Sequence, residues 1–401
     1  MKRTLLSLLF FLAAGLGTLT STALAQDGIP LNQPLHGYYT YGQLQGVTTE
    51  EAIRGAAAAT TIPLGPYTVT SSRDDNTYSG VLVGRSPFFH GARTTTIPAF
   101  IVPIKIKTSD GHVFDPSVAD STCLSSKVPL TVFQNSPLFK SVAFTMNGVS
   151  VGTTQYADAF ERAEFWQSVS VTGNRFHTML SSSPTILPEQ TLTLTASQSD
   201  DFAGGFCSGH LGIIDFNTFD SFVQNTIVPL VTSNGGGPTS FPMILLYNVV
   251  IDPSFDQNNP LNGCCILGYH KEFSNPVQTY GIMDFDTTGA FNQPGSTTAD
   301  ISVSSHEINE WVNDPLGNNP TPSWGNIGQV GGCQPNFEVG DPLSGTLIPN
   351  VTLNSFTYHM QELAFFSWFY GAPSIGTGSS DFSNNGTFKG DAILCPPGGT
   401  N

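Results

Sequence analysis

The sequence is poor in positive charge. Lysine and arginine together account for 14 of its 401 residues, against 30 aspartate and glutamate residues, and the formal net charge is −16. Nucleic acids and anionic membrane surfaces are bound largely through basic side chains, so this composition excludes a protein that binds either by electrostatic attraction. Charged residues of both signs make up only 11% of the chain, so hydroxyl and amide side chains must supply much of the polar surface.

Long apolar runs are also missing, except at the start of the chain. A basic stretch, Met1 to Arg3, precedes an apolar run from Leu5 to Leu19 and the small-x-small sequence Ala23-Leu24-Ala25. This order is typical of a secretory signal peptide, so we expect residues 1–25 to be removed near Ala25. The run is shorter than the ~18 apolar residues that a membrane span needs. We therefore expect a secreted extracellular or periplasmic protein without a membrane span, with a formal charge of −18 once Lys2 and Arg3 are lost.

No Cys-x-x-Cys pair occurs, which argues against a zinc site made of cysteines. The even number of cysteines in a chain that we expect to be exported indicates disulfides instead. The sequence does not choose among the possible pairings, but we expect the adjacent Cys264 and Cys265 to bond to different partners. The disulfide candidates are Cys123, Cys207, Cys264, Cys265, Cys333 and Cys395.

Glycine (41 residues) and proline (28 residues) are frequent, which favours strands joined by long loops. We expect an N-terminal arm or linker over residues 26–61, which could be a removable pro-segment, and a β-rich region over residues 62–205. A second region, residues 206–401, would follow, and the two regions could share one core.

Alternating and β-branched runs predict the strands of both regions. Predicted strands cover residues 78–83, 96–107, 127–133, 142–151, 191–196 and 280–285. The proline within residues 101–106 favours a sheet edge or a bulge there, and the apolar run over residues 241–251 predicts a central strand covered on both faces. Predicted helices cover residues 156–168 and 216–228, the second ended by Pro229. We expect a loop over residues 315–334, and a helix or buried strand over residues 356–370.

The strongest chemical signal is a helix expected over residues 304–315. At ~100° per residue, Ile308 belongs to an apolar stripe, while His306 and Glu310 lie above one another on the other side. Zinc needs about three protein ligands and an open position for water, and two ligands four residues apart on a helix supply two of them. Glu307 would then reach the bound water as general base. Histidine is usual at both ligand positions, so the carboxylate of Glu310 also admits Ca²⁺.

A third metal ligand is expected downstream, in Phe337-Glu338-Val339-Gly340-Asp341-Pro342. Glu338 is the preferred candidate, while Asp341 is an alternative ligand or a partner of His306. His270 could line the same cleft, as a partner or an alternative ligand. The competing interpretation of the helix is a solvated face that carries a glutamate near its end.

These residues carry a resemblance to a known family. Ser305-His306-Glu307-Ile308-Asn309-Glu310, the following Asn313-Asp314-Pro315, Trp324, Glu338-Val339-Gly340-Asp341 and the aromatic segment around Gln361 resemble the Exordium-like (phosphate-induced) proteins and related bacterial exported proteins. The resemblance covers about residues 241–395. It implies a zincin-like fold, with His306, Glu310 and Glu338 as ligands and Glu307 as base. Two features depart from the pattern of that family. Trp324 is followed by glycine, where the family has tyrosine, and Cys333 precedes the acidic motif, whereas the family's cysteine follows it.

The sequence therefore predicts an α+β protein, with a β-rich N-terminal half and a zincin-like half that contains a mixed sheet and an active-site helix. The expected function is a secreted, zinc-dependent hydrolase of the metallopeptidase type that acts on peptides or proteins. The alternative is a non-catalytic protein of the cell envelope or wall with a structural metal site on the same scaffold. A glycan-active domain is a third possibility, but no carboxylate pair for it is recognisable.

Overall fold

The computed structural model describes residues 29–30, 35–42, 48–89, 91–204, 207–260, 263–273, 277–371, 375–378, 381–392 and 394–395. The expected signal peptide, residues 1–25, lies outside these described residues. Within them, no helix combines the length and the apolar character that crossing a bilayer would require.

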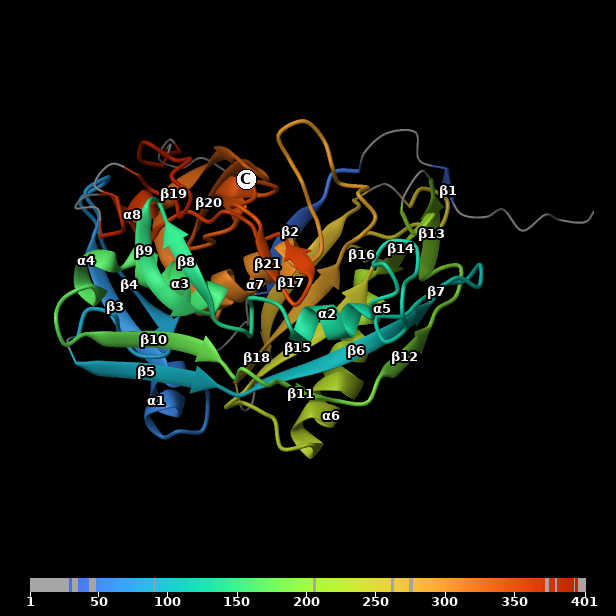
Figure 1. Ribbon diagram of the computed structural model, residues 1–401, viewed down its shortest axis with the longest axis horizontal. Helices are drawn as coiled ribbons and strands as arrows, with labels where there is room; N and C mark the ends of the chain where they lie inside the picture. Colours follow the sequence, from blue (N-terminus) through green and yellow to red (C-terminus); the bar gives the residue numbers. More distant parts are fainter. Residues whose placement is uncertain are drawn as a thin grey trace, which may run out of the picture.

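The fold is α+β and is organised on one curled, mixed sheet to which twelve strands of the described chain belong (Figure 1). These strands are β1 (Ile29–Pro30), β2 (Tyr38–Gly42), β6 (Ala99–Lys107), β7 (Val113–Phe114), β11 (Thr185–Ile186), β12 (Gln190–Thr193), β13 (Ser199–Ala203), β14 (His210–Asp215), β15 (Phe241–Tyr247), β16 (Val249–Asp252), β17 (Ile266–Phe273) and β18 (Gln278–Phe285). They follow the order β1-β13-β14-β16-β17-β18-β15-β6-β11, with β2 paired to β17 and both β7 and β12 paired to β6. Since β6 lies beside β15, residues from both expected regions belong to one sheet.

Smaller sheets complete the β-structure. Four are antiparallel hairpins, and the strands β5 (Ala92–Ile97) and β10 (Arg175–Leu180) pair in parallel. The hairpins are β3 (Leu64–Thr70) with β4 (Thr77–Val83), β8 (Val142–Met146) with β9 (Val149–Thr154), β19 (Pro320–Ile327) with β20 (Val330–Asn336), and β21 (Val351–Leu353) with β22 (Phe356–Tyr358). The strands predicted at residues 78–83 and 280–285 are confirmed, and residues 142–151 form a hairpin at Asn147-Gly148, where both residues have positive φ.

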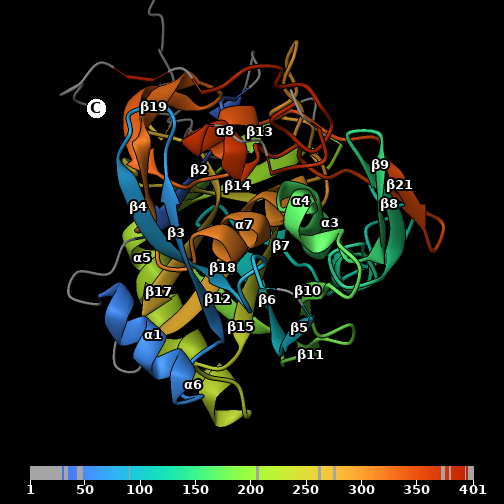
Figure 2. The same ribbon diagram turned by 90° about the vertical axis from the view of Figure 1, so that its left-hand side faces the viewer.

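Helices cover both faces of the large sheet. They are α1 (Thr49–Ala57), α2 (Pro129–Gln134), α3 (Tyr156–Glu164), α4 (Trp166–Val169), α5 (Phe216–Phe222), the π-helical turn η1 (Val223–Ile227), α6 (Val228–Ser233), α7 (Ser302–Asn313), the 3-10 turn η2 (Asp341–Leu343) and α8 (Phe366–Tyr370). Figure 2 shows α7 across the middle of the molecule, with α8 and β19 above it and α6 below.

The strand β15 explains why the sheet is covered on both faces. Its residues alternate between two apolar clusters, as the period of a strand requires. Met243 and Leu245 pack in the cluster that contains most apolar residues of α7, whereas Ile244 and Leu246 pack in the cluster that contains apolar residues of α5, η1 and α6. The predicted central strand is therefore confirmed, although it ends at Tyr247, and β16 begins after Asn248, whose φ is +55°. The first cluster draws residues from Ile62 to Ala392, so both expected regions share one core.

Two predictions based on proline are wrong. β6 is not an edge strand, because β15 pairs on one side and β11 and β12 on the other. Pro103 is tolerated because β11 pairs as far as Ile101 and β12 begins opposite Ile104, so the missing N–H falls between the two pairings. Pro229 does not end the helix before it, since η1 already interrupts the regular hydrogen-bond pattern and α6 continues through the proline.

Two element types were also predicted wrongly. The strand predicted over residues 127–133 is wrong, since Pro129–Gln134 form the helix α2, in which Pro129 stands in the first turn and is buried with Val132 and Phe133 at helical spacing. Residues 315–334 are not a loop, since most of them belong to the hairpin β19–β20. Its glycines and prolines hide the strand pattern, although Trp324 is fully buried in the core.

The described cysteines form three pairs at disulfide distance, which are Cys123–Cys207, Cys264–Cys265 and Cys333–Cys395. The expectation that Cys264 and Cys265 have different partners is wrong. Their sulfur atoms lie at disulfide distance from each other, and the other four described cysteines pair among themselves.

Candidate metal centre

The helix α7 lies inside the protein. All of its residues, Ser302 to Asn313, are buried, so neither a solvated face nor an open cleft-lining face is present. Trp311 stacks on Phe241 with ring centroids 3.8 Å apart and donates from Nε1 to Thr279. A Cβ at Gly268 of β17 would lie 3.0 Å from Cγ of Glu307, so this glycine permits the helix to approach the sheet closely.

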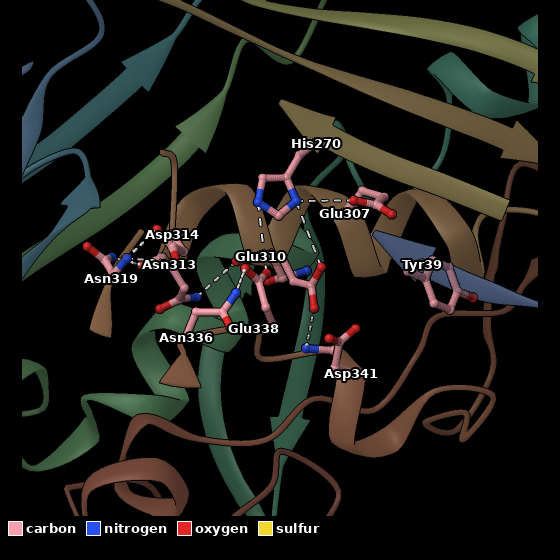
Figure 3. Close-up of polar contacts among 12 residues, drawn as sticks. Tyr39, His270, Glu307, Glu310, Asn313, Asp314, Asn319, Asn336, Glu338 and Asp341 are labelled. Atoms are coloured by element: carbon pink, nitrogen blue, oxygen red, sulfur yellow. Dashed lines mark hydrogen bonds and ion pairs between the residues drawn. The ribbon is translucent and has the colours of Figure 1, made fainter. Parts of the chain in front are cut away.

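Four side chains from α7 and β17 converge at this contact, and Figure 3 shows three of them, His270, Glu307 and Glu310. Nε2 of His306 lies 2.9 Å from Oε2 of Glu310, as the i and i+4 spacing on a helix allows. His270 of β17 places its Nδ1 3.2 Å from Oε2 of Glu307 and 3.8 Å from Oε2 of Glu310. His270 is therefore part of the site and does not merely line its entrance.

The two acidic residues predicted downstream approach from the segment after β20. Oε2 of Glu338 lies 3.9 Å from Nε2 of His270, and its Oε1 accepts a hydrogen bond from Asn336. Oδ1 of Asp341 lies 3.6 Å from Nε2 of His306. Glu338 thus joins the cluster beside His270, and Asp341 is the downstream carboxylate that faces His306.

Strand β2 covers the cluster on one side. The ring of Tyr39 stacks on the imidazole of His306, with centroids 3.7 Å apart and planes inclined by 15°. Tyr41 is aligned with His270 in the pairing of β2 with β17, with ring centroids 6.3 Å apart. Tyr39 also lines a surface hollow of about 320 Å³, together with Gln329 and Pro342. This part of the expected N-terminal arm therefore separates the hollow from the buried histidine.

Burial and charge affect the two histidines in opposite ways. Burial and the nearby charge of His306 lower the pKa of His270 to about 3, so His270 is neutral. Burial alone would lower the pKa of His306 too, but the carboxylates around it, chiefly Glu310, raise it well above its ordinary value. A neutral imidazole is the form that binds a metal ion, so His270 is already in the ligand state.

The surroundings of the carboxylates in the cluster disfavour their charged form. Burial raises the pKa of Glu307, Glu310 and Glu338, and repulsion from neighbouring carboxylates raises each of them further. Among the ion pairs of the described residues, none joins a lysine or arginine to these groups or to Asp341. Protons or a cation must therefore offset the negative charge.

The donor set fits a divalent cation. Two groups of three residues, His306 with Glu307 and Glu310, and His270 with Glu310 and Glu338, offer ligand atoms within 4.8 Å of one another. Buried polar atoms in both groups lack a hydrogen-bond partner in the described chain, among them Nδ1 of His306, Nε2 of His270 and one oxygen each of Glu307 and Glu338. Imidazole and carboxylate ligands suit zinc, and the excess of carboxylates also admits a harder ion.

The sequence identified most of this cluster but not its surroundings. His306, Glu307 and Glu310 were placed correctly on one helix, and His270 and the two acidic candidates also lie at the site. Tyr39 was missed because the polar segment before it shows no periodicity. Gln361, noted only as part of the aromatic segment, donates to the carbonyl oxygen of Gly340 and helps to hold the segment that carries Glu338 and Asp341.

No family model matches the sequence, and no curated protein or solved structure is significantly similar to it. The resemblance to Exordium-like proteins rests on the motifs within residues 241–395 alone.

Proposed function

We propose that the protein is an exported, metal-dependent hydrolase of the peptidase type, with its ion held between α7 and β17. Two groups of possible ligands, His306 with Glu307 and Glu310, and His270 with Glu310 and Glu338, share Glu310 and contain unpartnered buried ligand atoms, and this observation carries the proposal. Glu338 or Asp341 would complete the ligand set. Zinc is the preferred ion and Ca²⁺ the alternative. The three cysteine pairs and the expected signal peptide support export to an oxidising compartment.

The chain's own residues suit hydrolysis of a peptide bond. A bound zinc ion would polarise the substrate carbonyl and acidify a water molecule. Glu307 is the proposed general base, because Oε1 has no hydrogen-bond partner in the described chain while Oε2 faces His270. His270 would thereby hold the carboxylate in a fixed direction. Tyr39 must move before a peptide can reach His306, so β2 is the proposed cover of a latent site.

A second candidate function is a non-catalytic, exported protein of the cell envelope or wall in which the metal only stabilises the fold. Complete burial of the cluster favours it, because structural metal sites are closed and catalytic ones keep an open position.

The experiment compares wild type with His306→Ala and Glu307→Gln, and uses His177→Ala as the matched control. His177 is a partly exposed histidine, on β10, that pairs with Asp158. Metal content is measured by mass spectrometry, and peptide turnover is measured with fluorescence-quenched peptide substrates, with and without a chelator. We expect His306→Ala to weaken zinc binding at least ~100-fold, and Glu307→Gln to retain zinc but lose about 10²–10⁴-fold in turnover.

Each outcome separates the two candidates. Bound zinc without turnover, both before and after limited proteolysis of the N-terminal arm, would favour the structural role. A wild-type protein that binds no divalent ion would refute both. Full peptidase activity in Glu307→Gln would refute the role given to this glutamate.

A further inference from the structure

A second cluster of histidine and aspartate lies at another part of the large sheet. His112 precedes β7, Asp201 is on β13 and His210 is the first residue of β14. In the antiparallel pairing of β13 with β14, His210 is opposite Ala203, two residues from Asp201, so Asp201 and His210 share one face. β7, β13 and β14 lie together at the right-hand end of the view in Figure 1, away from α7 at the centre.

The contacts in this cluster bring two imidazoles to one carboxylate. Nδ1 of His210 is in close contact with Oδ2 of Asp201, and Nδ1 of His112 lies 3.7 Å from the same oxygen. The two imidazole rings overlap, with centroids 3.6 Å apart. His112, Asp201 and His210 each offer a ligand atom within 4.8 Å of the others, and Asp110 adds a carboxylate oxygen 2.5 Å from Nδ1 of His112.

Asp201 supplies an independent indication of a ligand. Its side chain is 0% exposed, and Oδ1 has no hydrogen-bond partner within the described residues. In the described chain the ion pairs of Asp110 and Asp201 are with His112 and His210, and none is with a lysine or arginine. A cation would satisfy the buried oxygen and both carboxylates.

The second cluster borders a solvent-exposed hollow, and a cysteine pair connects the loops around this hollow. His112 and His210 line a hollow of about 450 Å³, and their side chains are 31% and 24% exposed. Thr122 and Ser208, which also line it, are the neighbours of Cys123 and Cys207, one of the cysteine pairs. The pair therefore ties together the two loops that form the rim, which favours a preorganised site.

We propose that His112, Asp201 and His210 form a second divalent-metal site, separate from α7 and open to solvent on one side. Two imidazoles with one carboxylate favour a borderline transition metal ion, with zinc the first candidate, over Ca²⁺ or Mg²⁺. Three protein ligands leave a position toward the hollow for water or for a small coordinating molecule. This site does not depend on the proposed hydrolytic function.

The full-length exported chain, stripped of metal with a chelator and then dialysed, is titrated with zinc in competition with a chromophoric chelator. We expect one binding event in wild type to disappear in His112→Ala/His210→Ala, with affinity at that site at least 100-fold weaker. The event should persist in His306→Ala, which separates this site from α7. His177→Ala is the matched control, since His177 pairs with one aspartate at 2.7 Å and is 33% exposed but belongs to none of the groups of possible metal ligands among the described residues. A double variant that binds zinc with the stoichiometry and affinity of wild type would overturn the proposal.

A measurement on the unaltered chain keeps the proposal testable if the double variant does not fold. Diethyl pyrocarbonate modifies accessible imidazole nitrogen atoms, and the modified residues are identified by peptide mass spectrometry. Zinc should slow modification of His112 and His210 at least 10-fold and leave His177 unchanged. Equal modification of the three histidines with and without zinc would refute the site.

Discussion

Replacing Gly340 with alanine would place one methyl group against the imidazole of His306. An ideal Cβ at Gly340 lies 2.4 Å from Nδ1, 2.5 Å from Cε1 and 2.7 Å from Cγ of that ring. Ordinary contacts begin at 3.4 Å, so the shortest contact requires a movement of about 1.0 Å. The φ of Gly340 is −88°, which alanine adopts freely, so the effect of Gly340→Ala would come from this contact and not from backbone strain.

The expected loss of zinc affinity follows from the narrow range of distances that metal ligands tolerate. The stacked ring of Tyr39 restricts how the imidazole can shift, and metal–ligand distances hold within about 0.2 Å, so a displacement near 1 Å removes a good ligand geometry. We expect zinc affinity to fall about 10–100-fold, as when an orienting contact is lost. At saturating zinc this corresponds to about 1.4–2.7 kcal/mol less metal-linked stability. Overpacking adds about 1–3 kcal/mol of destabilisation with or without metal.

Urea denaturation of wild type, Gly340→Ala and Gly331→Ala, each with excess zinc and with chelator, separates these two effects. Gly331, on β20, is the matched control, because an added Cβ there meets no atom within 4 Å. Gly331→Ala should match wild type in both conditions, and Gly340→Ala should gain less stability from zinc. The reasoning is refuted if zinc stabilises Gly340→Ala as much as wild type, because His306 would then not be a ligand at this position.

Two further predictions concern the cover of the site and the support of α7. Tyr39→Ala should accelerate removal of zinc by a chelator at least ~10-fold, because Tyr39 is 4% exposed and packs on His306. The control is Tyr38→Ala, which alters the opposite face of β2. Equal rates of zinc removal in the two variants would contradict the role of Tyr39 as cover. Burial raises the pKa of Glu161 to about 8, and its Oε1 accepts a hydrogen bond from Asn313 of α7. Because this pKa is raised above the unfolded value near 4.5, the folded protein should lose stability, on the order of a few kcal/mol, as pH rises from about 4.5 to 8. Thermal denaturation of Glu161→Gln at several pH values should show a weaker dependence of stability on pH. A pH dependence equal to that of wild type would count against Glu161 as its cause.

Local patterns in the sequence predicted part of the fold. The uninterrupted apolar run that begins at Phe241 predicted a doubly covered strand, and the spacing of His306 and Glu310 predicted a shared helix face. Both rest on the order of residues within one short segment, which periodicity reports directly. Pro229 misled the prediction of a helix end because a proline is compatible with the first turn of a helix as well as with the end of one.

Long-range pairings were beyond the reach of the same patterns. Nothing near Tyr39 indicates that β2 adds to β17, because the pairing depends on residues more than 200 positions later. The full burial of α7 also depends on elements distant in the chain, among them the segment that carries Gly340 and the strand β2. Periodicity predicted which side of α7 would carry His306 but not that Tyr39 would cover it.

The position of β6 in the large sheet has a consequence for dissecting the chain. A fragment that begins at residue 206 would keep α7 and all the acidic candidates but would lack β6, the neighbour of β15. The backbone of Phe241–Tyr247 would then have an unpaired edge, and its buried, mostly apolar side chains would lose part of their cover. Such an edge is a template for intermolecular strand pairing, so the C-terminal half produced alone should form aggregates before it can hold a metal ion.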